Sequence, residues 1–264
     1  MMITSTGNQK VKRLVNLRKK RKARDEEKVF LVEGIRMFRE VPAERLLEAY
    51  VSESFYKREG GTVSRVLEGC AVRPEILSDT VYDYVSDTKT PQGVLCVVRQ
   101  KEYTFAEAAG GERAHILVLD NLQDPGNMGT VIRTAEGAGV TGIVMSSECV
   151  DVYNPKTIRS TMGSVYRMPL YRAKDLTEAV RRMKESGIHT YAAHLDGVLS
   201  YDEADLTKPC AFFIGNEGSG LREEVAALAD TYIRIPMEGE VESLNAATAA
   251  AVLMFEAARQ RRQQ

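Results

Sequence analysis

Three separate segments in the second half of the chain combine glycines with carboxylate, amide and hydroxyl side chains. Glycine lets a backbone turn sharply or come close to a ligand, and polar side chains beside it can orient a bound molecule. One such segment alone is usually an ordinary turn between a strand and a helix, but three together predict a ligand-binding site. The segments are residues 120–129 (DNLQDPGNMG), 214–221 (IGNEGSGL) and 235–249 (IPMEGEVESLNAATA).

The charge of these three segments indicates which ligand they suit. A glycine-rich turn that leads into a helix is typical of phosphate and dinucleotide sites, because helix N-termini attract anions. No Lys or Arg occurs in residues 114–132, 209–221 or 235–258, whereas the three segments carry the acidic residues Asp120, Asp124, Glu217, Glu238, Glu240 and Glu242. The turn also departs from G-x-G-x-x-G, although Glu148 lies where a ribose ligand would be expected. The pattern favours a phosphate-free, positively charged nucleoside such as S-adenosylmethionine, with a dinucleotide as the alternative.

Arg133 is the one cation close to the first segment, one helical turn after Gly129. It could act on a substrate, or it could pair with Glu136 three residues later on the same helix face.

Residues from His115 onward alternate apolar runs with amphipathic stretches. This alternation predicts a mostly parallel sheet covered by helices on both faces, and the three segments then fall at the carboxyl ends of strands, where such sheets bind ligands. Strands are expected over residues 115–120, 142–147, 166–171, 189–194, 211–215 and 232–236. Helices are expected over residues 130–138, 154–160, 177–186, 221–229 and 243–262, with Ser243 capping the last.

The first 99 residues are expected to form a smaller α/β domain, followed by a polar linker over residues 100–113 that contains a flexible Ala-Ala-Gly-Gly stretch. The domain begins with a basic amphipathic helix over residues 10–24, which holds nine Lys or Arg residues and no acid. The helix is either a solvated surface or a site for RNA phosphates. The candidate phosphate contacts are Lys10, Lys12, Arg13, Arg18, Lys19 and Lys20.

The composition limits the remaining possibilities. A net charge of −1 gives no overall basic field, so binding of nucleic acid would depend on such local clusters. The four cysteines are far apart and form no C-x-x-C pair, so we expect no metal site and a reducing compartment. The sequence has no apolar signal segment and no run long enough to span a bilayer, which indicates a cytoplasmic protein without a membrane partner.

Three motifs that overlap these segments, residues 124–135 (DPGNMGTVIRTA), 214–221 and 235–249, resemble in this order the motifs of the SpoU (TrmH) branch of the SPOUT class of RNA ribose 2′-O-methyltransferases. The front half is also similar to the RNA-binding domain of these enzymes, at residues 5–17, 30–34 (FLVEG) and 90–93 (TPQG). The resemblance implies an α/β fold whose C-terminal SPOUT domain, residues 114–264, carries a deep trefoil knot, together with homodimers and S-adenosylmethionine as cofactor.

The resemblance also assigns roles to individual residues. Catalytic roles near the target ribose fall on Arg133, Asn127, Glu217, Ser243 and Asn245. Cofactor contacts fall on Gly215, Ile235 and Leu244, with Gly218 in the same glycine-rich loop and His194 at the border of the pocket. Because arginine stays protonated in proteins, we expect Arg133 to orient the hydroxyl or a phosphate instead of acting as a base, with Glu217 orienting Arg133 or Asn127.

The expected activity is methyl transfer to a ribose 2′-hydroxyl. The separate RNA-binding domain favours 23S ribosomal RNA as the substrate. The alternatives are a transfer RNA substrate, or a non-catalytic RNA-binding protein of the same fold.

Overall fold

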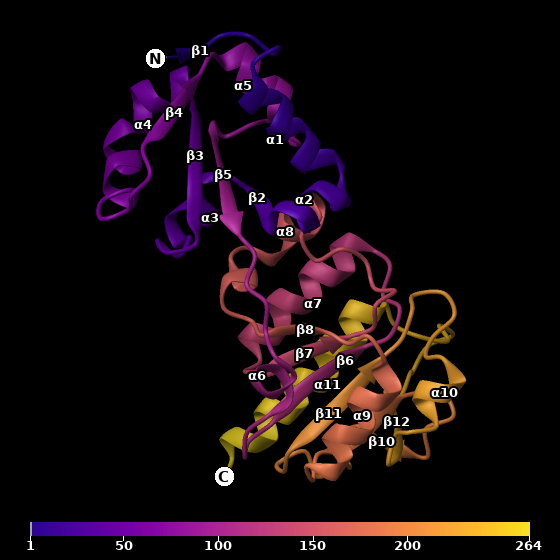
Figure 1. Cartoon of the computed structure of the whole chain (residues 1–264). Coiled ribbons are helices and arrows are strands. Elements are labelled where there is room, and N and C mark those ends of the chain that lie inside the picture. Colours follow the sequence, from indigo (N-terminus) through magenta and orange to yellow (C-terminus); the bar gives the residue numbers. More distant parts are fainter. Residues whose placement is uncertain (1) are drawn as a thin grey trace. The chain divides into compact units, whose positions relative to one another are not determined.

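The computed structural model describes residues 2–264 and divides into two compact units (Figure 1). Unit 1 contains the residues up to Lys101 together with Asp151–Tyr166, and unit 2 contains Glu102–Val150 and Arg167–Gln264. The segment Asp151–Tyr166 therefore packs with the N-terminal unit, although the sequence placed it in the C-terminal domain.

Unit 1 is built on a five-stranded mixed sheet with the order β1-β4-β3-β5-β2. β5 runs antiparallel to β2 and β3, whereas β4 runs parallel to β1 and β3. The strands are β1 (Met2–Ile3), β2 (Val29–Glu33), β3 (Leu46–Ser52), β4 (Pro74–Leu77) and β5 (Val94–Arg99). The helices are α1 (Gln9–Lys19), α2 (Arg21–Glu27), α3 (Ile35–Glu40), α4 (Glu53–Val66), α5 (Asp79–Val85), α8 (Pro155–Thr161) and the 3₁₀ turn η1 (Ser164–Tyr166).

The prediction of a single basic helix over residues 10–24 is wrong. Lys20 has an extended backbone (φ −117°, ψ 118°), so the chain forms α1 and then α2. α1 buries Val11, Leu14 and Leu17 as its apolar spacing predicted. The break at Lys20 turns Arg24 inward, where it is 3% exposed.

The partner of Arg24 explains why Asp151–Tyr166 belongs to unit 1. The Arg24 guanidinium donates to Asp151 Oδ2 through Nε (3.2 Å) and Nη2 (2.5 Å), and the Tyr153 ring stacks on Phe30 with centroids 4.8 Å apart. A buried charge needs an opposite charge, and this pairing spans 127 residues. The sequence pattern alone gives no sign of it.

Unit 2 is built on a seven-stranded sheet in which every neighbouring pair is parallel, with the order β10-β12-β9-β11-β6-β7-β8. The predicted mostly parallel sheet is thus confirmed. Figure 1 shows α9 on one face and α11 on the other. The strands are β6 (His115–Leu119), β7 (Gly142–Met145), β8 (Leu170–Arg172), β9 (His189–Ala193), β10 (Leu199–Ser200), β11 (Cys210–Ile214) and β12 (Thr231–Arg234). The helices are α6 (Phe105–Ala109), α7 (Pro125–Gly137), α9 (Leu176–Glu185), α10 (Glu223–Ala226) and α11 (Ala246–Arg262).

Several helix boundaries differ from the predicted ones because of capping. α7 begins at Pro125 and not at Thr130, since the Asp124 side chain accepts a hydrogen bond from the Asn127 amide and proline suits the first helical turn. Residues 125–129, expected as a turn, are therefore helical. α11 is capped by Asn245 and not by Ser243.

Three other elements also differ in extent from the prediction. α10 is a single turn, shorter than expected. The strand expected over residues 166–171 is reduced to β8. The stretch expected as a flexible linker contains α6, which has a capping box at Thr104 and buries Ala108 and Ala109 in the core of unit 2.

Candidate functional site

The three motif segments lie at one edge of the unit 2 sheet. Residues 120–124 follow β6, residues 215–222 follow β11 and residues 235–245 follow β12. Because all these strands are parallel, their carboxyl ends meet at the same edge, as the sequence predicted.

Glu217 joins the second segment to the first. Its carboxylate accepts hydrogen bonds from the backbone N–H groups of Gln123 (3.0 Å) and Asp124 (2.9 Å) and from Asn127 Nδ2 (3.0 Å). Partial burial of this otherwise exposed side chain raises the pKa of the carboxyl, but the hydrogen bonds from Asn127 and from the two backbone groups outweigh that effect and hold the pKa below its ordinary value. Glu217 is therefore ionised at neutral pH and orients Asn127, one of the two roles expected for it.

Asn127 in turn joins the first segment to the third. Its Oδ1 accepts a hydrogen bond from Asn245 Nδ2 at 3.1 Å. The Asn245 Oδ1 accepts from the backbone N–H groups of Ala247 (2.9 Å) and Thr248 (3.3 Å) and so caps α11. The structure thus brings Glu217, Asn127 and Asn245 into one chain of hydrogen bonds, and both amide orientations are fixed by it.

The second segment closes on itself. Asn216 and Gly220 exchange two backbone hydrogen bonds, of 2.9 and 3.0 Å, and Asn216 Oδ1 accepts from the Gly218 amide at 2.9 Å. A Cβ atom at Gly215 would lie 2.2 Å from the carbonyl carbon of Gly220, so only glycine fits there.

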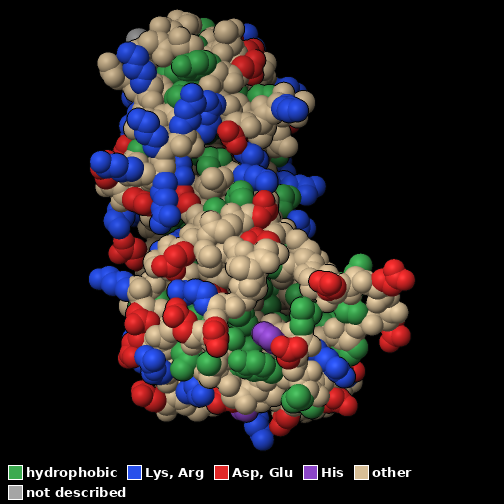
Figure 2. Space-filling model, turned by 90° about the vertical axis from the view of Figure 1, so that its right-hand side faces the viewer, with side chains coloured by type: hydrophobic (Ala, Val, Ile, Leu, Met, Phe, Trp, Pro, Cys, Tyr) green, Lys and Arg blue, Asp and Glu red, His purple; other side chains and the backbone are tan. Residues whose placement is uncertain are grey.

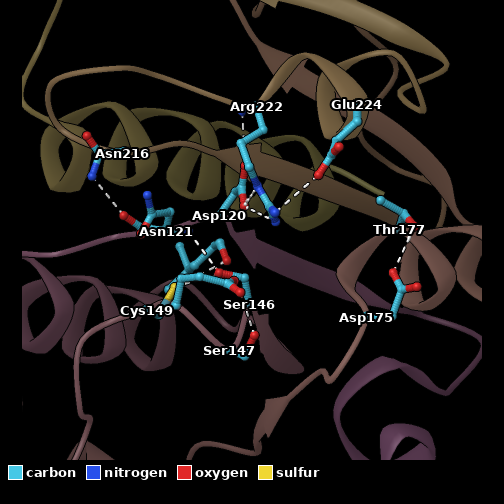
Figure 3. Close-up of polar contacts among 12 residues, drawn as sticks. Asp120, Asn121, Ser146, Ser147, Cys149, Asp175, Thr177, Asn216, Arg222 and Glu224 are labelled. Carbon is cyan, nitrogen blue, oxygen red and sulfur yellow. Dashed lines mark hydrogen bonds and ion pairs between the residues drawn. The ribbon is translucent and has the colours of Figure 1, made fainter.

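An ion pair between Asp120 and Arg222 lies beside this loop, and the sequence reasoning missed it (Figure 3). Asp120 is fully buried and lies 2.7 Å from the Arg222 guanidinium. The signal was present in the sequence, since Asp120 directly follows a buried strand and Arg222 is the first cation after the cation-free second segment.

Arg133 is not in contact with this network. It is exposed and has no hydrogen-bond or ion-pair partner among residues 2–264, and Glu136, its expected partner in the alternative interpretation, pairs with Arg167 instead. Ser243 is likewise exposed and forms no hydrogen bond within the described chain. Both side chains are free to contact another molecule.

The expected cofactor residues lie along the same edge of the sheet. His194 follows β9 and donates its backbone N–H to the Ile233 carbonyl in β12 at 3.0 Å, with its ring 5.1 Å from that of Tyr232. Gly215, Ile235 and Leu244 are half-buried in the second and third segments, and Gly218 is exposed.

The chemistry of these loops fits S-adenosylmethionine. They carry no cation from Pro209 to Leu221 or from Ile235 to Ala258, and Glu217 is ionised. The loops also expose the apolar side chains of Leu195 (66%) and Val241 (61%). Apolar surface suits an adenine ring, backbone groups can bind its edge, and carboxylates favour a positive sulfonium over a polyphosphate.

The structure divides the six candidate RNA contacts into two groups. Lys10 pairs with Glu75, Arg13 pairs with Glu27 and Glu48, and Arg18 donates to the backbone carbonyls of residues 84–86. The remaining three are exposed and have no ion-pair partner in the described chain: Lys12, Lys19 and Lys20. Figure 2 shows many Lys and Arg side chains on the visible face of unit 1.

The described residues offer neither a cluster of metal ligands nor a helix suited to a bilayer. Among residues 2–264, no group of three or more His, Cys, Asp or Glu side chains is arranged to hold a metal ion. None of the helices in that range combines the length and the apolar character needed to span a membrane.

Comparison with known proteins gives matches over both halves of the chain. Residues 114–255 match the model of the SpoU rRNA methylase family, and residues 8–96 match the MRM3-like substrate binding domain. The chain is 34% identical over 253 residues to the 23S rRNA (guanosine(2553)-2'-O)-methyltransferase RlmP of Bacillus subtilis, which covers 96% of this chain and 97% of the relative.

Two solved structures are similar along almost the whole chain. The AdoMet-bound rRNA methyltransferase from Sinorhizobium meliloti has a TM-score of 0.86 and 30% identity, over 98% of this chain and 97% of that one. The SpoU methyltransferase AviRb from Streptomyces viridochromogenes, in complex with AdoMet, has a TM-score of 0.84 and 28% identity, over 96% and 98% of the two chains. The family resemblance read from the three motifs is therefore confirmed, and the chain belongs to the SpoU rRNA methylase family.

Proposed function

We propose that this protein transfers a methyl group from S-adenosylmethionine to a ribose 2′-hydroxyl of 23S ribosomal RNA. The observation that carries the proposal is the hydrogen-bonded network of Glu217, Asn127 and Asn245, which links all three family motifs at the carboxyl edge of the sheet. Family membership and the AdoMet-bound structural relatives support the cofactor.

The cofactor would be held by the loops that follow β9, β11 and β12. Gly215, Gly218, Ile235 and Leu244 would offer mainly backbone groups to its adenine and ribose, with His194 at the border. When bound, S-adenosylmethionine supplies an electrophilic methyl group on a positively charged sulfur.

The protein's own residues would position the ribose hydroxyl. Much of the rate of a methyl transfer can come from alignment of two bound reactants. Asn127 and Asn245 are already fixed by their hydrogen bonds, and each has one amide N–H left to donate. Arg133 is free and permanently charged, so it would orient the hydroxyl or a neighbouring phosphate and stabilise negative charge that develops on the oxygen. Ser243 is free to contact the same ribose.

Unit 1 would bind the RNA substrate. Its match to the MRM3-like substrate binding domain and the three unpaired lysines, Lys12, Lys19 and Lys20, support this role. Full-length similarity to RlmP, named as a 23S rRNA enzyme, supports ribosomal RNA over transfer RNA.

We further propose that the protein works as a homodimer in the cytoplasm and that the segment before α11 completes a trefoil knot, as the family resemblance implies. Three alanines of α11 are buried inside unit 2, Ala247, Ala250 and Ala257, but Phe255 on the same helix is 46% exposed. An exposed aromatic ring of this kind suits a contact with a second copy. Light scattering on the purified protein tests the dimer, since a monomeric mass at micromolar concentration would contradict it.

The central experiment combines binding and activity. The full chain is titrated calorimetrically with S-adenosylhomocysteine and with NAD, and it is then incubated with radiolabelled S-adenosylmethionine and deproteinised 23S rRNA or transfer RNA. We expect binding of the first ligand alone and label in 23S rRNA, at a ribose 2′-oxygen that is unmethylated in a deletion strain. Label only in transfer RNA would refute the proposed substrate, and no label in either RNA would refute the activity.

A further inference from the structure

The Asp120–Arg222 pair lies where the two ends of the loop 215–221 come together. Asp120 is the first residue after β6, and its backbone N–H donates to the Ile214 carbonyl at 2.9 Å, at the last residue of β11. The same residue's carboxylate accepts the backbone N–H of Arg222 at 3.0 Å. Asp120 therefore holds both the residue before the loop 215–221 and the residue after it.

The Asp120 carboxylate and the Arg222 guanidinium make two short contacts. Arg222 Nε donates to Asp120 Oδ1 at 2.9 Å, and Nη2 lies 2.7 Å from the same oxygen. Figure 3 shows Glu224 on the other side of the guanidinium, with its Oε1 3.1 Å from Nη1. Charge-assisted bonds to a fully buried carboxylate are among the stronger polar contacts in a protein.

Asn121, which follows Asp120 in the first segment, makes a second contact with the loop 215–221. Asn121, whose backbone is left-handed (φ 56°), accepts a hydrogen bond from Asn216 Nδ2 on its carbonyl at 2.8 Å. Its own N–H donates to Ser146 Oγ at 3.0 Å, which fixes this turn against the end of β7. Asn216 in turn holds the amides of Gly218 and Ser219 through its side-chain oxygen. The two ends of the loop 215–221, the turn at Asn121 and the middle of the loop are thus joined in one set of contacts.

The positive charge of Arg222 is already paired, because its guanidinium contacts the carboxylates of Asp120 and Glu224. The contacts of Arg222 with Asp120 hold one end of the loop 215–221, which contains no cation itself.

We propose that Asp120 and Arg222 are positioning residues, which hold the loop 215–221 in the conformation that binds the cofactor. The inference rests on the proposed function, because it assigns the loop to S-adenosylmethionine. Neither residue touches the reacting atoms, and their effect passes through the backbone groups of Gly215 and Gly218.

The test compares Asp120→Asn and Arg222→Lys with the wild-type chain and with the control Glu224→Gln, which changes only an exposed partner of the same guanidinium. Calorimetry with S-adenosylhomocysteine gives the Kd, and methyl transfer at saturating RNA gives KM for the cofactor and kcat. We expect Kd and KM to rise roughly 10- to 100-fold in both variants, since Asp120→Asn removes the buried negative charge and Arg222→Lys loses guanidinium hydrogen bonds to it. Because Glu217 keeps its own three hydrogen bonds, kcat should change less than about threefold, and the control should match the wild type.

Hydrogen–deuterium exchange separates this role from a general loss of stability. The Asn216 and Gly220 amides should exchange faster in the variants while the amides of β11 keep their protection. Arg222→Lys, which retains the positive charge, provides this readout even where Asp120→Asn does not fold. Suppose that the wild-type chain binds the cofactor and methylates RNA. An unchanged Kd in the variants, or a loss of kcat alone, would then overturn the inference. A wild-type chain that binds no S-adenosylhomocysteine would instead refute the proposed function.

Discussion

The replacement Glu217→Ala should separate activity from stability. The carboxylate accepts three hydrogen bonds of 2.9 to 3.0 Å, two of them from backbone N–H groups. Its side chain is exposed, so water can replace it at those groups, and we expect a loss of only about 1–2 kcal/mol in the free energy of unfolding. Asn127, however, loses one of the two partners that fix its amide and keeps only Asn245, and misplacement of a positioning group by about 1 Å can lower a rate about 100-fold.

The double variant Glu217→Ala/Asn127→Ala tests whether the two residues act as one unit. If each single change lowers the rate about 100-fold, independent residues would together cost about 10,000-fold, whereas a shared network would cost about 100-fold. The assay is the initial rate of methyl transfer from radiolabelled S-adenosylmethionine to 23S rRNA, together with denaturant unfolding. Glu240→Ala, which removes an exposed acid that forms no ion pair in residues 2–264, is the matched control. Additive losses in the double variant would refute the coupling that the hydrogen bonds imply.

Three further measurements test other parts of the structure. Arg133→Ala should keep its affinity for S-adenosylhomocysteine and lose most methyl transfer, because the side chain is exposed and has no hydrogen-bond or ion-pair partner among the described residues, and full activity would remove it from the catalytic set. Replacing Lys12, Lys19 and Lys20 together by Ala should flatten the dependence of RNA affinity on salt by about 0.7–0.9 logarithmic units per lost phosphate contact, whereas replacing the paired Lys10 should have a smaller effect; an unchanged slope would make the unpaired lysines a solvated surface. Burial, and secondarily the charge of Arg261, lowers the pKa of His115 to about 4. The unfolded chain therefore binds this proton first, and stability should fall as the pH drops from about 6.5 towards 4, with a loss of about 2 kcal/mol at pH 5. In His115→Phe that part of the pH dependence should vanish, as denaturant unfolding at pH 7.5 and 5 would show, and its persistence would contradict the assignment.

Much of the fold followed from local patterns. The alternation of apolar and amphipathic stretches after His115 predicted the parallel sheet of unit 2, because that periodicity depends only on neighbouring residues. Helix ends were predicted less well. Asp124 caps α7 and starts it at Pro125 instead of residue 130, and Asn245 caps α11 in place of Ser243, since several polar residues near each end could have capped the helix and only packing selects one.

The sequence by itself determined the family, the order of the three motifs and the absence of cations around them, because these are properties of residue type and spacing. Only the tertiary structure decided which polar groups meet. It paired Asp120 with Arg222, fixed Asn127 between Glu217 and Asn245, and divided the basic residues of α1 into paired and free. It also placed Asp151–Tyr166 in unit 1 through the buried contact between Arg24 and Asp151. The physical reason is the same in each case: a charge or amide removed from water must find a partner, and that partner can lie a hundred residues away in the chain.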